Sequence, residues 1–239
     1  MRDIRIPLDG PLVESRFVER PNRFLLRCRV PGERVVQEVH MADPGRLREL
    51  LIPGRRVWIR PAAGPGRKTR WSAVLVERPD GEGVVSIDTS LPNRLIRFAL
   101  ERDALRELHP WRLARAEWAH GRSRFDFLLE APGRRPLAME VKSVTLVEGG
   151  IARFPDAVTA RGARHVRELT EMVGSGEFEA AVLFVLQRDD ARVIEAAPGI
   201  DPDFASALSE ARETGVRVLG RRCVVGLEAL RLGAPVPVR

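Results

Sequence analysis

The chain has 239 residues, of which 44% are hydrophobic and 31% charged, a composition typical of a folded protein rather than a disordered one. No apolar run approaches the ~18 residues that a membrane helix needs, and the polar N-terminus lacks the apolar core of a signal peptide. Cys28 and Cys223 stand alone, without the spacing of a metal site. These features argue against a helical membrane protein and predict a cytoplasmic protein without membrane contact.

The basic residues are concentrated in the first third of the chain. The net charge is +7, and residues 1–83 hold 17 Arg and Lys against 11 Asp and Glu, a net charge of +6. The remaining residues hold 23 against 22, a net charge of +1. This basic excess favours a polyanionic partner, because neutralising phosphates releases counterions. An uneven distribution of arginine without any function would look the same, so charge alone favours nucleic acid only weakly.

The first segment predicts short strands separated by turns. The strands are expected at 23–30, 37–41, 55–61 and 71–78. A short helix is predicted over 43–51, with Asp43 as its N-cap and a proline at its first position. This order is typical of a small β-barrel of the OB type, a shape that often holds nucleic acid. The turn-rich run "RPDGEG" ends this domain, which we assign to residues 1–83.

Residues 84–239 have the pattern of an α/β domain. In the helix predicted over 155–173, Val158 is assigned to the buried side. The predicted elements, in chain order, are a helix over 90–108, strands over 112–120, 124–130 and 137–147, a helix over 155–173, a strand over 180–187, a helix over 201–215, and strands over 216–219 and 223–227. Helices interleaved with strands in this order predict a mixed central sheet.

A hairpin predicted within residues 124–144 places two acidic residues opposite each other. If its turn is centred on the glycine of "APGRRP", Asp126 faces Glu140 across the two strands. Because side chains alternate along a strand, Glu140 and Lys142 share one face. The residues assigned to the opposite face are Met139, Val141 and Val144. Lys142 is also one of only two lysines in a chain that otherwise uses arginine.

Two carboxylates on neighbouring strands repel each other, since their Cβ atoms lie about 5 Å apart. A cation, a shared proton or a metal ion relieves this repulsion, and carboxylate oxygens suit Mg²⁺ or Mn²⁺. Lysine beside such an ion can orient or deprotonate an attacking water, which arginine cannot do. We therefore expect Asp126 and Glu140 to bind Mg²⁺ or Mn²⁺, and both to act with Lys142 in catalysis. A salt-bridged, solvated strand face is the alternative.

The flanking residues favour catalysis over a solvated face, because the strand that carries Glu140 is apolar enough to lie in mid-sheet. An Asp followed by Glu-x-Lys on paired strands matches the PD-(D/E)xK nuclease core in spacing and order. The order of helix, three strands, helix and strand matches the same core. The sequence thus predicts an OB-like barrel followed by a PD-(D/E)xK nuclease-like α/β domain.

The chain also resembles a known family, the sugar fermentation stimulation proteins. The matching segments are "HMADPGRLRELLIPG" and "GRKTRW" in the first domain, "TSLPNRLI" at the junction, and "GRSRFDFLL", "MEVKSVTL", "FPDAVTARGARHVREL", "LFVLQRDD" and "IDPDFASAL" in the second. They run along nearly the whole chain, and the run over 154–169 is long and idiosyncratic. The resemblance implies an OB-like domain joined to a nuclease-like domain, and nucleic-acid binding. The family name refers to effects on sugar metabolism, and DNA binding by the family suggests a regulatory role.

Other residues are candidates for the same site. Glu117, on the strand before Asp126, is a possible third metal ligand, although pairing with a nearby arginine explains it equally well. Arg161 and Arg164 lie on one helix face and are candidates to hold a phosphate. The alternative for Arg164 is a solvated ion pair with Glu168.

Three residues of the first domain are candidates to bind nucleic acid. Lys68 lies in a glycine-rich loop, where a flexible cation can reach a phosphate, and Arg46 lies in the predicted short helix. Trp71 is a candidate to stack on a base, although a tryptophan beside a strand also suits the core.

These features predict a nucleic-acid-binding protein that hydrolyses phosphodiester bonds with a divalent metal. DNA is the expected partner, with RNA and hybrids left open, and the sequence does not give the oligomeric state. The alternative is a DNA-binding transcriptional regulator that keeps a nuclease fold without cleaving, since fold does not dictate function. A weaker alternative is an interaction protein whose arginines serve only solubility.

Overall fold

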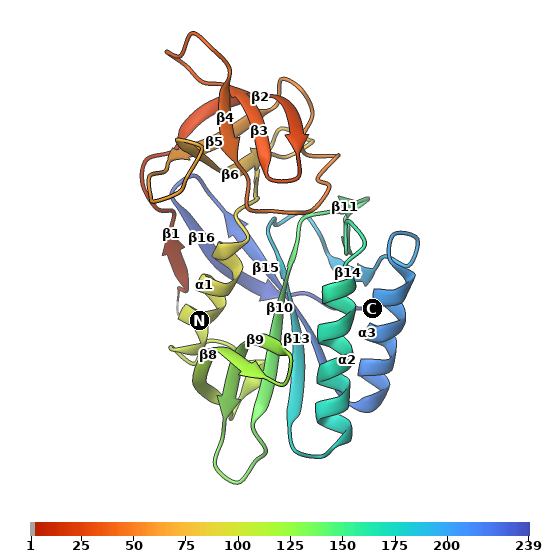
Figure 1. The fold of residues 1–239 in the computed structure, drawn as a ribbon. Coiled ribbons are helices and arrows are strands. Elements are labelled where there is room, and N and C mark those ends of the chain that lie inside the picture. The colour runs from red at the N-terminus through yellow and green to blue at the C-terminus, as the bar shows by residue number, and fades with distance from the viewer. Residues whose placement is uncertain (1–2) are drawn as a thin grey trace.

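The computed structural model describes residues 3–239, and two lobes stack along its long axis (Figure 1). The strands of the first lobe are β2 (Val13–Asn22), β3 (Leu25–Arg29), β4 (Gln37–His40), β5 (Arg56–Pro61), β6 (Trp71–Glu77) and β7 (Val84–Ser86). They hydrogen-bond in the order β4-β3-β2-β5-β6-β7, and an additional pairing of β4 with β6 closes the sheet into a barrel. This closed barrel confirms the OB-like fold that the sequence predicted.

Alternation of side chains along the strands builds the barrel core. On β3, Leu26 and Cys28 point inward and are fully buried, while the arginines between and beyond them are exposed. Burial raises the pKa of the Cys28 thiol to about 11, so this cysteine stays protonated and unreactive. β2 alternates in the same way, with Ser15 and Phe17 inward. Its many charged residues concealed it, and the sequence analysis did not predict this strand.

The short helix predicted over residues 43–51 is wrong. The segment is an irregular loop in which Leu47 has a φ of 48°, outside the helical region. The Arg20 guanidinium donates hydrogen bonds to several carbonyl oxygens of this loop, which therefore have a side-chain partner in place of helical N–H groups. The accepting carbonyls belong to Asp43, Gly45 and Arg46.

The second lobe is built on a mixed seven-stranded sheet. Its strands are β1 (Arg5–Pro7), β8 (Arg112–His120), β9 (Ser123–Glu130), β10 (Leu137–Val144), β13 (Glu179–Leu186), β15 (Arg217–Val225) and β16 (Ala229–Pro235). Their order is β1-β16-β15-β13-β10-β9-β8, with β10, β13 and β15 parallel and the other pairs antiparallel. A small second sheet contains β11 (Val147–Glu148), β12 (Ile151–Phe154) and β14 (Val193–Ala196). The predicted α/β architecture with a mixed sheet is confirmed.

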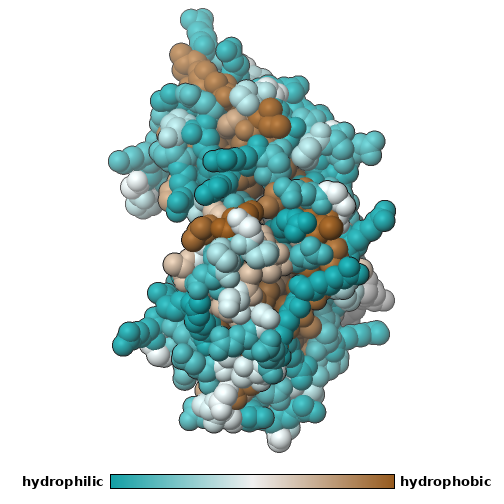
Figure 2. All heavy atoms as spheres, turned by 90° about the vertical axis from the view of Figure 1, so that its right-hand side faces the viewer, coloured by the Kyte–Doolittle hydropathy of each residue, from teal (hydrophilic) through white to brown (hydrophobic). Residues whose placement is uncertain are grey.

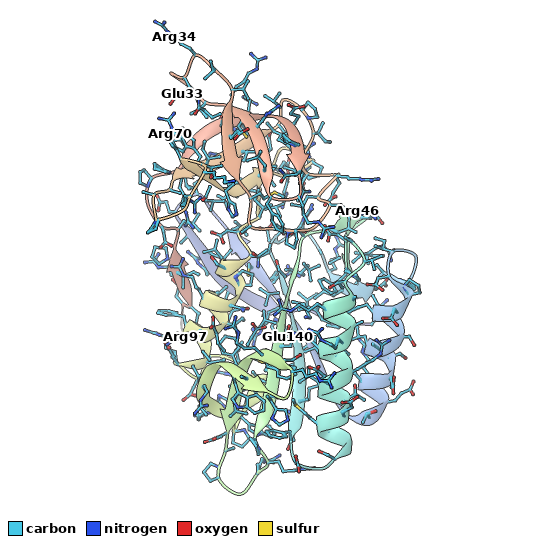
Figure 3. All side chains as sticks on the ribbon, viewed as in Figure 1. Glu33, Arg34, Arg46, Arg70, Arg97 and Glu140 are labelled. Carbon is cyan, nitrogen blue, oxygen red and sulfur yellow. The ribbon has the colours of Figure 1, made fainter. Side chains whose placement is uncertain are left out.

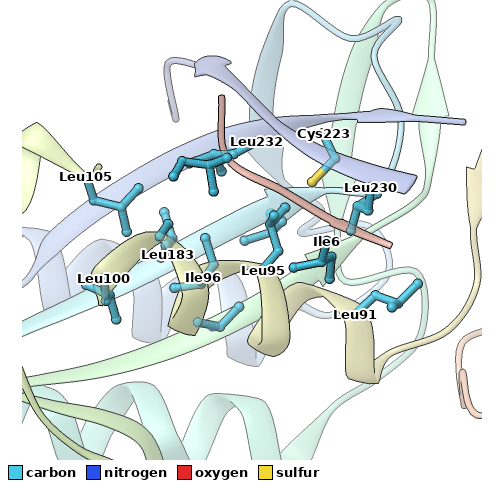
Figure 4. Packing of buried hydrophobic residues seen from close by; sticks show 14 of the residues in the cluster. Ile6, Leu91, Leu95, Ile96, Leu100, Leu105, Leu183, Cys223, Leu230 and Leu232 are labelled. Carbon is cyan, nitrogen blue, oxygen red and sulfur yellow. The ribbon is translucent and has the colours of Figure 1, made fainter. Parts of the chain in front are cut away.

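Helices cover both faces of the large sheet. α1 (Ser90–Leu100) packs on one face, where Leu91, Leu95 and Leu100 meet Ile6 and Leu183 (Figure 4). α2 (Ala160–Gly174) and α3 (Pro202–Thr214) lie side by side on the other face (Figure 1). No helix within residues 3–239 is long and apolar enough to cross a membrane.

Two side chains lie on a different side from the one predicted. Val144 packs in the core under α2, together with Ala138, and not with Met139. Val144 is two residues from Lys142, so strand alternation places both on one face, and the predicted assignment of Val144 to the opposite face was wrong.

α2 begins later than predicted, where the Thr159 side chain accepts a hydrogen bond from the Gly162 N–H at 3.1 Å. Val158 therefore precedes the helix and is 68% exposed.

The chain crosses between the lobes at both ends of the barrel. β1 precedes the barrel in sequence but pairs with β16 of the second lobe, and Ile6 is buried there. Residues 84–86 form β7 and pair with β6 of the barrel. The predicted division after residue 83 therefore differs from the structure in these two segments. The lobes also share apolar contacts, because Trp58 and Leu75 of the barrel belong to the same cluster as α1.

Candidate active site

The hairpin of β9 and β10 has the register that the turn position predicted. The paired positions are Leu137 with Leu129, Ala138 with Leu128 and Met139 with Phe127. Beyond them the ladder opens, and the Asp126 carboxylate accepts a hydrogen bond from the Val141 backbone N–H at 2.7 Å. Asp126 is thereby fixed beside the strand that carries Glu140 and Lys142.

A second contact to Asp126 comes from α1. Asn93 Nδ2 donates to Asp126 Oδ1 at 2.6 Å, while Oδ2 accepts from Val141. The carboxylate is therefore oriented by the sheet and by the helix at once. Sequence analysis did not identify Asn93 as a site residue, because the helical pattern alone does not tell which strand a residue at the start of α1 faces.

Glu140 lies in the second lobe on β10, near α2 (Figure 3), and is 6% exposed. Its Oε1 accepts hydrogen bonds from Lys142 Nζ and His165 Nδ1, both at 2.7 Å. Its Oε2 is buried and has no hydrogen-bond partner within residues 3–239. A buried carboxylate oxygen without a donor is costly, so this atom points to a missing cation or water.

The two carboxylates differ in their electrostatics. Burial, followed by the nearby Glu140 charge, raises the pKa of Asp126 to about 6. Burial also acts to raise the pKa of Glu140, but Lys142 and the hydrogen bond from His165 outweigh it, and the pKa of Glu140 is lowered. Glu140 is thus held ionised, while Asp126 carries an unfavourable charge that a cation would stabilise.

His165 connects the site to α2 and is 2% exposed. Arg161 Nε donates a hydrogen bond to His165 Nε2 at 3.4 Å. Because Nε2 is the acceptor, Nδ1 carries the hydrogen and donates the hydrogen bond to Glu140 Oε1. His165 lies one helical turn after Arg161, but the sequence analysis did not predict its bond to Glu140. The sequence signal that could have identified His165 was its position on the apolar side of an otherwise charged helix.

A cavity of about 640 Å³ opens over these residues. Glu140, Lys142 and Arg161 lie in its wall; Asp126 is not a lining residue, but it accepts a hydrogen bond from Asn93, which lines the cavity. Both lobes contribute to the cavity. The barrel supplies Arg23, Asp43, Pro44 and Gly45, and the second lobe supplies the segment 154–162.

The donors at this site fit a hard divalent cation. Within residues 3–239 no three His, Cys, Asp or Glu side chains are grouped so as to hold an ion. Asp126 and Glu140 are the two neighbouring carboxylates that could hold an ion, with water and substrate oxygens completing the coordination. Mg²⁺ is typically bound in this way, through one or two carboxylates and retained waters.

Glu117 is not brought to this site. It lies on β8 with a φ of 52°, and its side chain is 75% exposed. Its carboxylate lies 3.6 Å from the Arg124 guanidinium, the arginine pairing that the sequence left open. Glu117 is not among the residues that line the cavity.

Arg164 points to a separate cavity of about 570 Å³, which it lines together with Arg122 and Arg167. Its Nε lies 3.8 Å from Glu168, the ion pair that was the alternative to phosphate binding. Of the two helix arginines, Arg161 is the one that lies at the cavity over Glu140.

The candidates of the barrel are spread over its surface. Arg46 is exposed at the junction of the lobes, next to the cavity-lining Gly45 (Figure 3). Lys68 is exposed in the loop between β5 and β6, away from the cavity. Trp71 packs partly against the barrel core, which agrees with the core role that the sequence left open.

Each of the two lobes matches a model of a known protein family. The family model described as "SfsA N-terminal OB domain" matches residues 18–87, and the model described as "Sugar fermentation stimulation protein RE domain" matches residues 90–229. A sugar fermentation stimulation protein homolog of Shouchella clausii is 44% identical over 235 residues, which cover 98% of this chain and 99% of the relative. A homolog of Moorella thermoacetica is 43% identical with the same coverage.

A solved structure supports the same assignment. It is described as the structure of Pyrococcus furiosus SfsA in complex with Ca²⁺, and it covers 100% of both chains with a TM-score of 0.89 and 29% identity. The likeness therefore extends over both lobes and the cavity between them. The chain belongs to the sugar fermentation stimulation protein family.

Proposed function

We propose that this protein binds nucleic acid and hydrolyses its phosphodiester bonds with a divalent metal ion. The observation that carries the proposal is the buried Oε2 of Glu140, which has no hydrogen-bond partner within residues 3–239 and lies near a second, partly buried carboxylate and a lysine. A protein that only binds nucleic acid gains no evident benefit from such a costly arrangement. The Ca²⁺ in the Pyrococcus furiosus structure supports a divalent cation here, and Mg²⁺ or Mn²⁺ is the expected working ion.

The residues of the site divide the chemistry between them. Asp126 and Glu140 would hold the ion, which when bound neutralises charge on a phosphate and lowers the pKa of a coordinated water. Lys142 Nζ donates one hydrogen bond to Glu140, so two of its three N–H donors remain for the attacking water and a phosphate oxygen. Arg161 lies in the same cavity and is placed to neutralise a further phosphate oxygen.

A cleavage assay tests this proposal. Purified protein is incubated with DNA, RNA and hybrid oligonucleotides in Mn²⁺, in Mg²⁺ and in a chelator, beside Lys142→Ala. Cleavage is expected only with metal, and the variant should be slower by about 10²–10⁴-fold, the usual contribution of a positioned proton-transfer group. The matched control is Arg34→Ala, because Arg34 is an exposed cation at the far tip of the barrel (Figure 3).

The alternatives give different results in the same assay. If neither protein cleaves any substrate while both still bind DNA, the chain is a DNA-binding protein on a nuclease fold and the proposed hydrolysis is refuted. Binding should weaken steeply with added salt, because the net charge of +7 is largely on the barrel. Absence of any salt-dependent binding would remove the nucleic-acid function as a whole.

A further inference from the structure

The reacting groups lie at the floor of the cavity, not on an open surface. Glu140 is 6% exposed, and the side chain of Lys142 is 12% exposed. The space above them is about 640 Å³, within the range of about 300–1,000 Å³ that encloses one small ligand. A space of this volume accommodates about one nucleotide beside Lys142.

The walls of this cavity are held together by contacts between the lobes. Asp156 Oδ2 of the second lobe accepts a hydrogen bond from the Leu47 backbone N–H of the barrel at 3.3 Å. Gly45 packs so closely against this carboxylate that a Cβ there would lie 2.3 Å from Asp156 Oδ2. Arg20 fixes the same loop through its carbonyl oxygens. These contacts fix the barrel loop against the second lobe at the edge of the cavity.

The cavity wall combines apolar and cationic side chains with three acidic ones, Asp43, Glu140 and Asp156. Val158 lines it and is 68% exposed, so its side chain is available to an apolar group of a ligand. Pro44 lines it from the barrel side, and Arg23 and Arg161 lie in the same wall as exposed cations. Figure 2 shows hydrophobic residues gathered around the waist between the lobes, on the side of α2 and α3.

This combination distinguishes two forms of nucleic acid. A duplex stacks its bases inside and presents mainly phosphates to a protein surface. A single strand also exposes the faces of its bases, which need apolar contacts, next to phosphates that need cations. Both kinds of group meet in this cavity wall.

We propose that the substrate enters this site as a single strand, with an unpaired base against Val158 and the adjoining phosphates between Arg23 and Arg161. This inference rests on the proposed function, because it specifies the substrate of the same site. Paired regions of the nucleic acid would remain outside the cavity, against the barrel.

Binding measurements with matched variants test the inference. Fluorescence anisotropy is recorded in Ca²⁺ with a labelled 12-nucleotide single strand, as DNA and as RNA, and with a blunt hairpin duplex of the same sequence. The single strand is expected to bind at least tenfold more tightly than the duplex. Val158→Ser should weaken single-strand binding about fivefold, because a partly buried apolar contact is lost. Val35→Ser is the control, since Val35 is 69% exposed in a barrel loop far from the cavity.

The outcomes separate this inference from the proposed function. Duplex binding as tight as single-strand binding, or equal effects of Val158→Ser and Val35→Ser, would overturn the inference. Cleavage of blunt duplex as fast as of single strand would also overturn it, while leaving the nuclease proposal intact. A single-strand preference that is sensitive to Val158→Ser, in a protein that cleaves nothing, would uphold the binding mode and refute the proposed hydrolysis.

Discussion

His165 orients the carboxylate that the proposed reaction needs. Its ring projects from α2 and is buried against Phe125, and its two nitrogens contact Glu140 and Arg161. Because Nδ1 carries the proton, the imidazole donates to Oε1 of Glu140, while Oε2 has no hydrogen-bond partner within residues 3–239. Partners that orient metal ligands in this way often determine metal affinity.

Removing His165 is therefore expected to weaken metal binding. His165→Ala should lower the affinity for Mn²⁺ about 10–100-fold by titration calorimetry, because Glu140 loses an orienting donor. His165→Asn, whose amide can donate from the position of Nδ1, should retain more affinity than His165→Gln. A loss of metal-free stability alone, with the same Mn²⁺ affinity in all variants, would assign His165 a purely structural role.

Asp43 illustrates the cost of a buried carboxylate. Burial, and to a smaller extent the nearby Asp156 charge, raise the pKa of Asp43 to about 6, while the Gly45 N–H and the Arg20 charge act to lower it. The Glu49 charge adds a small rise. The folded state thus holds the proton more tightly than the unfolded chain. The stabilisation from this proton is complete below the unfolded pKa of about 4 and is lost as the pH rises through about 6.

Asp43→Asn is expected to stabilise the protein at neutral pH. Asparagine keeps the acceptor for the Gly45 N–H and removes the charge, so the gain in unfolding free energy should be about 2 kcal/mol larger at pH 7.5 than at pH 4.5. Urea unfolding of both proteins at the two pH values measures this difference. The control is Asp203→Asn, an exposed residue whose pKa Arg167 lowers and which should not gain stability at pH 7.5. Equal gains at both pH values would contradict the expectation.

At the scale of elements, the loop over residues 43–47 contributes to one wall of the cavity because hydrogen bonds from two other segments fix its backbone. Arg20 of β2 binds its carbonyl oxygens, and Asp156, just before α2, accepts the N–H of Leu47. The proline-containing sequence suits the start of a helix, yet these long-range bonds satisfy the backbone in another conformation. Gly45 is required here by close packing, since its φ is not in the left-handed region.

Gly45→Ala is therefore expected to disturb the contact between the lobes. The added Cβ would overlap the Asp156 carboxylate, and we expect a loss of about 1–3 kcal/mol in the free energy of unfolding. Gly199→Ala is the matched control, because nothing lies within 4 Å of a Cβ at that glycine and the change should stay within about 0.5 kcal/mol. If the two variants unfold at the same urea concentration, the loop can move to accept the added Cβ and the expectation is wrong.

At the scale of the whole molecule, the two lobes form one folding unit. β1 passes from the N-terminus into the sheet of the second lobe, and Trp58 and Leu75 of the barrel pack in the cluster under α1. Unfolding either lobe alone would expose this shared apolar surface. We therefore expect cooperative unfolding in a single transition.

The two cysteines provide a probe for each lobe. Both are free and fully buried, Cys28 in the barrel and Cys223 in the second lobe. Pulse labelling with a thiol reagent across a urea titration should give the same midpoint for both. Ile6→Ala, which removes a buried side chain of β1, should lower both midpoints together and cost about 2–4 kcal/mol. Labelling of Cys28 at lower urea than Cys223 would show that the barrel unfolds separately.

The sequence by itself determined the elements that depend on local patterns. Alternating and apolar runs gave most strands, helical spacing gave α1, α2 and α3, and the position of one glycine turn gave the register of β9 and β10. These features follow from short-range periodicity and turn chemistry, which a sequence shows directly. The pairing of Asp126 with the strand of Glu140 and Lys142 is predictable for the same reason.

Only the tertiary structure decided which distant groups meet at the site. Asn93 and His165 reach the carboxylates from two separate helices, the loop near Gly45 lines the same cavity, and no local pattern encodes this arrangement. The same holds for Val158, which the helical pattern assigned to the core but which the cap at Thr159 leaves exposed in the cavity wall. Contacts of this kind depend on how packed layers bring remote segments together, and that arrangement places a strand motif at the wall of a cavity.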